Sequence, residues 1–272
     1  MPAFDIESLA HEITTAQDSA AALSPPTSRF SDFTVSDGYD VARRVHEARV
    51  AEGAVPVGRK IGFTNEKIWS AVGLSEPVWA YVYESTVRHC PDGRAVLPIG
   101  RFLEPKIEPE IVVHFRAAPP VTEDPAAILD CIDWIAFGFE IVQSRFPGWK
   151  FKVADAVADQ VLHAALLIGE PRETSRLGPD LTAKLERFSV ALNCNGEVRE
   201  TGTGANVLGS PLRAIAHLMA VIANQPWAQP IRAGEIVTTG TLTAAPPISV
   251  GETWGAELEG IELPGMTIKF EH

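Results

Sequence analysis

Two glutamates stand two residues apart in the apolar stretch LEPKIEPEIVVH, residues 103–114. In a strand, Glu108 and Glu110 would point to the same face, because side chains alternate along a strand. A third glutamate, Glu140, interrupts the equally apolar stretch IAFGFEIVQSRF, residues 135–146. Buried carboxylates repel one another and each costs several kcal/mol to desolvate, unless a cation meets them.

Three carboxylates converge on one point if these two stretches pair as strands. Ligands that are all oxygen, with excess negative charge, suit a hard divalent cation such as Mg²⁺ or Mn²⁺. The alternative is that each glutamate faces solvent on an edge strand or pairs with Lys106 or Arg145. The metal interpretation is favoured because three glutamates share the pattern.

A lysine with a glycine on either side forms the second candidate group. In GRKIGFT, residues 58–64, an extended chain puts Gly58, Lys60 and Gly62 on one face and leaves room for a ligand. Such a lysine can steady an enolate or move a proton, although a solvated lysine on a surface strand fits equally well. Two glycine-rich stretches, residues 201–211 and 238–248, fit tight turns or a carboxylate-binding backbone.

Composition limits the class of protein. The chain has 272 residues, 46% of them hydrophobic, and a formal net charge of −12. The negative charge opposes binding to nucleic acid, and no apolar run has the length of a membrane span. Three scattered cysteines and the acidic start MPAFDIESLAHEI predict reduced thiols and a cytoplasmic protein.

The chain changes from helical to strand-like texture near residue 80. Helices are predicted at 5–23, from Ser36 to Gly53, at 66–72, at 124–132 and from Pro211, and a strand at 55–64. Further strands are predicted at 107–115, 135–143, 162–168, 187–195, 235–241 and 266–271. We therefore expect a helical N-terminal lobe carrying Lys60, residues 1–80, and a β-rich catalytic domain, residues 81–272.

The order of the motifs resembles the 2-keto-4-pentenoate hydratase and 4-oxalocrotonate decarboxylase group of the fumarylacetoacetate hydrolase superfamily. The matching segments are GRKIGFT, EPKIEPEIVVHF, FGFEIVQSRFPGWKFKVADAVADQ, TGTGANVLGSP and GTLTAAPPI. The resemblance implies an α+β fold with a mixed β-roll, barrel-like core, and a homo-oligomer built from dimers. It also implies Mg²⁺ or Mn²⁺ on Glu108, Glu110 and Glu140, a small 2-oxo acid substrate, and proton transfer assisted by Lys60.

Further substrate contacts follow from the same resemblance. Thr243 matches a position near the substrate, and the family's Asp-Asn-Ala-Ser-Ser stretch corresponds to residues 159–163, which include Gln160 and His163. The family's acid/base aspartate is replaced by Val78. Valine transfers no proton, so another group must act or the reaction differs. The candidates are Glu76, Glu84 and His163.

The leading hypothesis is a hydratase-like lyase that acts on a 2-hydroxy-dienoate in aromatic catabolism. One alternative is a decarboxylase of a 2-oxo-enedioate, whose second carboxylate would need a cation such as Arg59 or Arg145. Another is a catalytically impaired subunit that associates with a related pathway enzyme. A C–C hydrolase is less favoured, since the N-terminal lobe offers no His/Glu pair to activate water.

Overall fold

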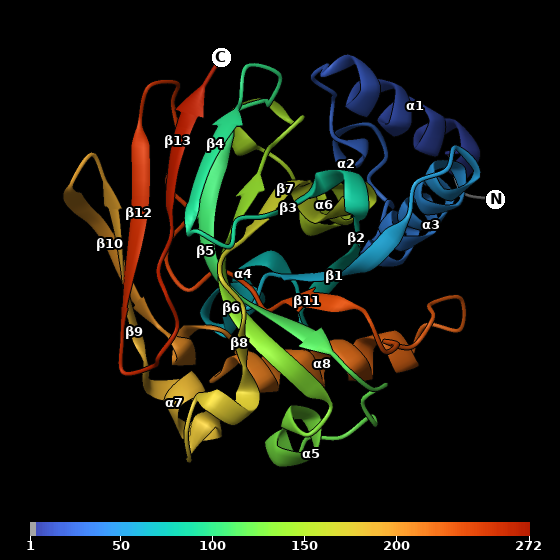
Figure 1. Cartoon of the computed structure of the whole chain (residues 1–272). Coiled ribbons are helices and arrows are strands. Elements are labelled where there is room, and N and C mark those ends of the chain that lie inside the picture. The colour runs from blue at the N-terminus through green and yellow to red at the C-terminus, as the bar shows by residue number, and fades with distance from the viewer. Residues whose placement is uncertain (1–3) are drawn as a thin grey trace.

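The larger of two sheets contains the strands that carry the candidate residues (Figure 1). The computed structural model describes residues 4–272. The strands of the larger sheet are β1 (Pro56–Gly62), β2 (Val78–Tyr83), β3 (Val87–His89), β5 (Lys106–Phe115), β6 (Ile132–Val142), β7 (His163–Ile168), β8 (Arg172–Glu173) and β11 (Ile236–Thr238). Their order is β2-β1-β11-β5-β6-β7-β3, with β8 beside β6. The strand carrying Lys60 and those carrying the glutamates therefore lie close together.

The register of the central pair fixes the relative positions of the glutamates. β5 and β6 are antiparallel, with Glu108 opposite Glu140 and Glu110 opposite Gly138. On the other face of β5, Ile107 and Ile111 are fully buried. The apolar residues between the glutamates thus anchor the strand in the core, and that anchoring turns both carboxylates to one side.

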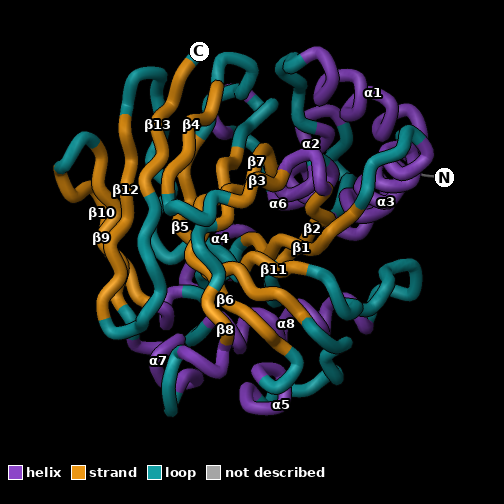
Figure 2. The backbone as a smooth tube through the Cα atoms, in the orientation of Figure 1, coloured by secondary structure: helices purple, strands orange, loops and turns teal. Residues whose placement is uncertain are grey.

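The smaller sheet packs against the larger one around a shared core (Figure 2). Its strands are β4 (Arg94–Pro98), β9 (Ser189–Cys194), β10 (Glu197–Thr203), β12 (Thr253–Glu259) and β13 (Thr267–Glu271), in the order β10-β9-β12-β13-β4. Phe137 and Phe139 of β6 belong to the same buried cluster as Ile268 and Phe270 of β13.

The N-terminal helices gather beside one end of the larger sheet (Figure 1). They are α1 (Ile6–Ser19), α2 (Pro26–Arg29) and α3 (Val35–Ala51), and α6 (Val153–Ala158) packs against α3. α1 is shorter than predicted because Ala20 takes a left-handed conformation. α3 begins two residues earlier than predicted, since Thr34 and Asp37 form a capping box and Ser36 lies inside the helix.

The remaining helices are α4 (Trp69–Val72), α5 (Pro125–Leu129), α7 (Leu181–Arg187) and α8 (Pro211–Ala223). Ser210 caps α8 as the sequence predicts. α5 is shorter than predicted because Ile132 already begins β6. The stretch Gly204–Ala223 is apolar enough to cross a membrane, but 61% of it is buried inside the protein, as expected of a core helix.

Most predicted strands are confirmed to within three residues at each end. β11 ends three residues earlier than predicted, because the chain leaves the sheet after Thr238 and Gly240 takes a φ of +101°. In the larger sheet, β1 pairs with β11, which comes late in the chain, and β2 pairs with β1. The expected division at residue 80 therefore falls inside β2, within the larger sheet, and the organisation into a helical lobe and a β-rich catalytic domain stays a prediction.

Candidate metal centre and its cavity

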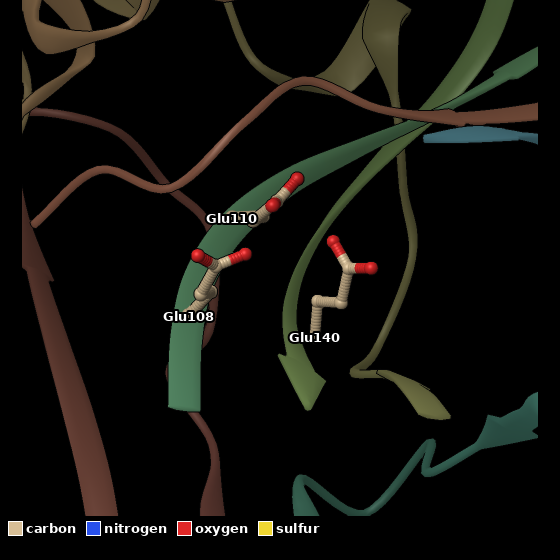
Figure 3. Close-up of side chains that lie close together, drawn as sticks. All are labelled: Glu108, Glu110 and Glu140. Atoms are coloured by element: carbon tan, nitrogen blue, oxygen red, sulfur yellow. The ribbon is translucent and has the colours of Figure 1, made fainter. Parts of the chain in front are cut away.

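The three glutamates converge on one point between β5 and β6 (Figure 3). Each offers a carboxylate oxygen, and these oxygens lie within 4.8 Å of one another. Glu110 and Glu140 are fully buried, and Glu108 is half-buried. The arrangement has the donor type and spacing of a site for a hard divalent cation.

Two of the carboxylate oxygens have no hydrogen-bond partner within the described residues. Oε2 of Glu110 accepts the backbone N–H of Gly240 at 2.8 Å, but its Oε1 is buried and unpaired, as is Oε2 of Glu140. Buried acceptors without partners are costly in a native structure. The donor set therefore fits Mg²⁺ or Mn²⁺, while the role of these residues as ligands stays a prediction.

Burial and mutual repulsion dominate the electrostatics of the cluster. Burial raises the pKa of Glu108 to about 7, although Lys60 opposes the rise. Burial and the two neighbouring carboxylates raise the pKa of Glu110 well above its usual value. Burial would also raise the pKa of Glu140, but Lys60 and His163 together hold it below the usual value. The cluster thus lacks enough positive charge of its own.

Lys60 supplies the buried ammonium of the site. Its Nζ lies 3.1 Å from Oε1 of Glu140 and donates to the carbonyl of Val161 at 3.0 Å. Burial alone would lower the pKa of Lys60, but the three glutamates raise it above the usual value. The lysine is therefore protonated, and the expectation of a solvated surface lysine is wrong.

The glycines beside Lys60 serve a different purpose from the one predicted. A Cβ on Gly58 would lie 2.0 Å from the carbonyl oxygen of Ile236, and a Cβ on Gly62 would lie 2.4 Å from Cγ1 of Val161. The absence of side chains at these glycines leaves room for β11 and for the turn at residues 160–162, and not for a ligand. That close approach brings the Val161 carbonyl to the ammonium.

The turn at Gln160–Leu162 is an unusual piece of backbone. All three residues have positive φ, at 52°, 51° and 63°, a region that non-glycine residues, and β-branched ones above all, rarely adopt. The side chains of Val161 and Leu162 line the cavity described below. Nothing in the sequence indicates this conformation, because no glycine marks it.

His163 and Gln160 lie behind the cavity rather than in its lining. Nδ1 of His163 is 2.7 Å from Oε1 of Glu140, and its Nε2 is 2.8 Å from the Thr86 hydroxyl. Gln160 donates to the Tyr83 hydroxyl at 3.1 Å. His163 therefore orients a carboxylate, and neither side chain contacts the space where a substrate would lie.

A cavity of about 640 Å³ opens next to the carboxylates. Its lining includes Lys60, Glu108 and the predicted Thr243, but not Val78, which is buried beside Gly62. The predicted substrate contact of Thr243 is compatible with this placement, and it stays a prediction. Further lining residues come from the segment after Lys60, the stretch between β6 and α6 and the glycine-rich turns, and include Phe63, Thr64, Glu66, Lys67, Trp149, Phe151, Asn206, Leu208 and Thr241.

Several residues suggested by the sequence lie elsewhere. Arg145 pairs with the buried Asp159 at 2.8 Å, and Arg59 pairs with Glu235 at 2.7 Å. Both arginines are buried away from the cavity lining, so neither is free to bind a second substrate carboxylate. Glu76 and Glu84 are exposed and also absent from the lining, which removes them as replacements for the family aspartate.

Two charged lining residues were missed by sequence reasoning, Glu66 and Lys67. They belong to the short helical turn that directly follows β1. Their position just after GRKIGFT was the available signal, because a segment that leaves the lysine strand must pass close to the lysine. Both side chains are exposed at the rim.

Comparison with known proteins places this geometry in context. A family model for the fumarylacetoacetate (FAA) hydrolase C-terminal domain matches residues 69–265. The chain is 30% identical to the 2-hydroxyhexa-2,4-dienoate hydratase of Comamonas testosteroni over 94% of both chains. It is 28% identical to the 4-oxalocrotonate decarboxylase of Pseudomonas sp. (strain CF600) over 93% of this chain and 92% of that one.

Solved structures give the same pattern. The 4-oxalocrotonate decarboxylase of Pseudomonas putida G7, complexed with magnesium and adipate, superposes with a TM-score of 0.87 at 27% identity, over 97% of each chain. The fumarylpyruvate hydrolase of Pseudomonas aeruginosa, with Mn²⁺ and pyruvate, has a TM-score of 0.57 at 13% identity, covering 80% of this chain and 90% of that one. These comparisons confirm the predicted resemblance and the predicted α+β fold.

Proposed function

The chain belongs to the fumarylacetoacetate hydrolase family, and on that premise we propose that it is a divalent-metal-dependent lyase, a hydratase that adds water to a 2-hydroxy-dienoate or 2-oxo-enoate of the 2-keto-4-pentenoate type in aromatic catabolism. The observation that carries the proposal is the cluster of three carboxylates with two unpaired buried oxygens, beside a protonated lysine and a cavity. The relatives named hydratases support the reaction type.

Glu108, Glu110 and Glu140 would hold Mg²⁺ or Mn²⁺. When bound, the cation supplies Lewis-acid stabilisation for the enolate of a 2-oxo acid. The protein's own contribution is to fix the three carboxylates: β5 and β6 set their spacing, Gly240 holds Glu110, and His163 holds Glu140. The structural neighbours complexed with magnesium, calcium or Mn²⁺ support a divalent ion.

Lys60 acts on the substrate oxygens from the cavity lining. Its Nζ carries a proton at neutral pH because three glutamates raise its pKa. The ammonium can stabilise negative charge on the 2-oxo group and give up a proton as the dienol becomes a ketone. The net reaction consumes one water: hydroxide reaches C4, and the water proton and the enol proton reach C3 and C5.

Glu66 takes the place of the missing acid/base group in this scheme. Val78 replaces the family aspartate, and Glu66 is the carboxylate that lines the cavity outside the glutamate cluster, among the described residues. As a general base it would activate the water that attacks C4. Thr243, whose hydroxyl donates to the Ala244 carbonyl at 2.7 Å, also lines the cavity and would contact the substrate there.

A decarboxylase of 4-oxalocrotonate type is the second candidate. The TM-score of 0.87 with the Pseudomonas putida G7 decarboxylase favours it. Decarboxylation needs the metal and Lys60 but no base that activates water. The effect of replacing Glu66 therefore distinguishes the two reactions. A third possibility, an impaired subunit of a mixed complex, would leave the partner's activity unchanged when Glu108 is replaced by alanine.

The test is turnover of 2-hydroxypenta-2,4-dienoate and of 4-oxalocrotonate, each with Mg²⁺, Mn²⁺ or EDTA. The proposal predicts metal-dependent formation of a 4-hydroxy-2-oxo acid, with kcat about 10² to 10⁴ lower in Glu66→Gln. Glu257→Gln, an exposed glutamate on β12, is the matched control and should match the wild type. Release of CO₂ with no hydration would establish the decarboxylase, and no turnover of either compound would contradict both reactions.

We also propose a homo-oligomer built from dimers that acts in the cytoplasm and associates with a related pathway enzyme. The three cysteines are free thiols, which is consistent with a reducing compartment. Light scattering of the purified protein, alone and mixed with a pathway partner, tests the assembly.

A further inference from the structure

One wall of the cavity is formed by a single apolar cluster. The members that line the cavity are Phe63, Val142, Trp149, Phe151 and Leu162. Val142 and Leu162 are buried, whereas the three aromatic side chains are partly exposed. Partly exposed aromatic side chains gathered around a cavity are typical of a ligand-binding surface.

The aromatic part of this wall is held in place before any ligand binds. The indole N–H of Trp149 donates to the carbonyl of Glu104 at 3.0 Å. Lys106 places its Nζ 3.8 Å from the centre of the Trp149 ring, and the rings of Trp149 and Phe151 lie 6.0 Å apart. A fixed wall loses little entropy when a ligand binds.

The cavity offers no buried cation for the far end of a substrate. Within the described lining, Lys60 is engaged by Glu140 and Val161, and Lys67 is exposed at the rim. Arg59 and Arg145 are bound in ion pairs elsewhere. A carboxylate pushed against the apolar wall would lose its hydration without gaining a buried partner.

The volume also exceeds the needs of a five-carbon acid. About 640 Å³ lies in the range of about 300–1,000 Å³ that is typical of pockets for much larger ligands. We propose that the preferred substrate is a 2-hydroxy-2,4-dienoate with a neutral apolar substituent, alkyl or aryl, at the end remote from its carboxylate. This inference rests on the proposed function and excludes an enedioate as the preferred substrate.

The test compares 2-hydroxypenta-2,4-dienoates that differ only at C5: unsubstituted, methyl, phenyl and carboxylate. The metal-loaded enzyme should show kcat/KM about fourfold higher for each added methylene-sized group, highest for phenyl. The carboxylate should be at least about tenfold below methyl. A carboxylate preferred over methyl and phenyl would overturn the proposal, and so would equal kcat/KM across the series.

Variants of the wall locate the effect. Phe151→Ala should reduce the preference for phenyl over hydrogen at least about tenfold, and Phe151→Arg should shift the preference towards the carboxylate. Phe30→Ala removes a partly buried aromatic of the N-terminal helices, outside the cavity, and should keep the wild-type preference. An unchanged preference in both Phe151 variants would contradict the assignment of the wall.

Metal-dependent binding of oxalate to the same samples separates this proposal from the one it rests on. Oxalate reproduces the 2-oxo-carboxylate end and has no tail. Bound oxalate with no preference for apolar tails overturns the inference about the wall alone. Absence of oxalate binding in every metal condition overturns the proposed function, and with it the inference.

Discussion

At the scale of single residues, the site is defined by an imbalance of charge. Three glutamates face one protonated lysine, and two of their buried oxygens have no hydrogen-bond partner within the described residues. Buried negative charges that outnumber their positive partners are costly in a low-dielectric interior. The imbalance explains why the cluster fits a divalent cation better than a network of salt bridges.

A partly buried histidine with a shifted pKa, His46, lies behind the site. Its ring stacks on Tyr81 at 3.7 Å, and its Nδ1 lies 2.9 Å from the hydroxyl of Tyr83, which also receives the hydrogen bond from Gln160. Burial, and secondarily Arg59, lowers the pKa of His46 from 6.5 to about 4. The neutral imidazole is therefore part of the folded state.

This pKa predicts a loss of stability in mild acid. Below pH 6.5 the unfolded chain binds a proton at His46, while the folded protein resists protonation until about pH 4. The free energy of unfolding should therefore fall as pH drops through this window. Urea unfolding at several pH values checks it, with His46→Phe, which keeps a ring but cannot titrate, showing a shallower fall. An equal fall in the free energy of unfolding with pH in the wild type and in His46→Phe would contradict the contribution of His46.

At the scale of elements, close approach between neighbouring segments positions the functional groups. Gly58 lets β11 lie against β1, and Gly62 admits the turn whose Val161 carbonyl holds Lys60. Gly240, with a φ of +101°, aims its N–H at Glu110. Each of these contacts joins segments that are far apart in sequence.

Adding a methyl group at Gly58 should damage this arrangement. Because the new Cβ would lie 2.0 Å from a backbone oxygen, which cannot move like a side chain, Gly58→Ala should lower the free energy of unfolding by about 1–3 kcal/mol. The matched control is Gly100→Ala, whose nearest neighbour lies 3.7 Å away. Urea denaturation measures both, and equal stabilities would show that the sheet accommodates the methyl group.

The positions of many helices and strands were predictable from local sequence patterns. Alternation in residues 107–115 and 135–143 predicts β5 and β6, and the Ser210-Pro211 pair predicts the start of α8. The capping box at Thr34 and the left-handed turn at Gln160–Leu162 were not foreseen. The first depends on a choice between neighbouring caps, and the second on tertiary contacts that overrule local preference.

At the scale of the whole molecule, the fold gathers groups that sequence spacing alone leaves apart. The family resemblance predicted the three glutamates and Lys60 as one site, and the sheet order brings their strands together. The resemblance did not reveal that Arg59 forms an ion pair with Glu235 and that Arg145 forms one with Asp159, because ion-pair partners distant in sequence carry no local signal.

Filling the cluster with a cation should stabilise the entire chain. A ligand that binds the folded state alone, at about 100 times its Kd, adds about 2.7 kcal/mol. For a chain of this size we expect Tm to rise by about 5 °C in Mg²⁺ or Mn²⁺. Differential scanning calorimetry measures it, with NaCl of equal ionic strength as the control. An equal shift in NaCl would indicate general screening instead of a specific site.

The measurement that tests the central claim most directly is calorimetric titration of oxalate into the protein with Mg²⁺, with EDTA, and into Glu110→Gln with Mg²⁺. Glu110→Gln keeps the shape of the side chain and an acceptor for Gly240 but removes the charge. The account predicts binding in Mg²⁺, none in EDTA, and affinity at least about tenfold weaker in the variant, with Glu257→Gln unchanged. Oxalate binding that survives both EDTA and Glu110→Gln would contradict a metal centre built from these three glutamates.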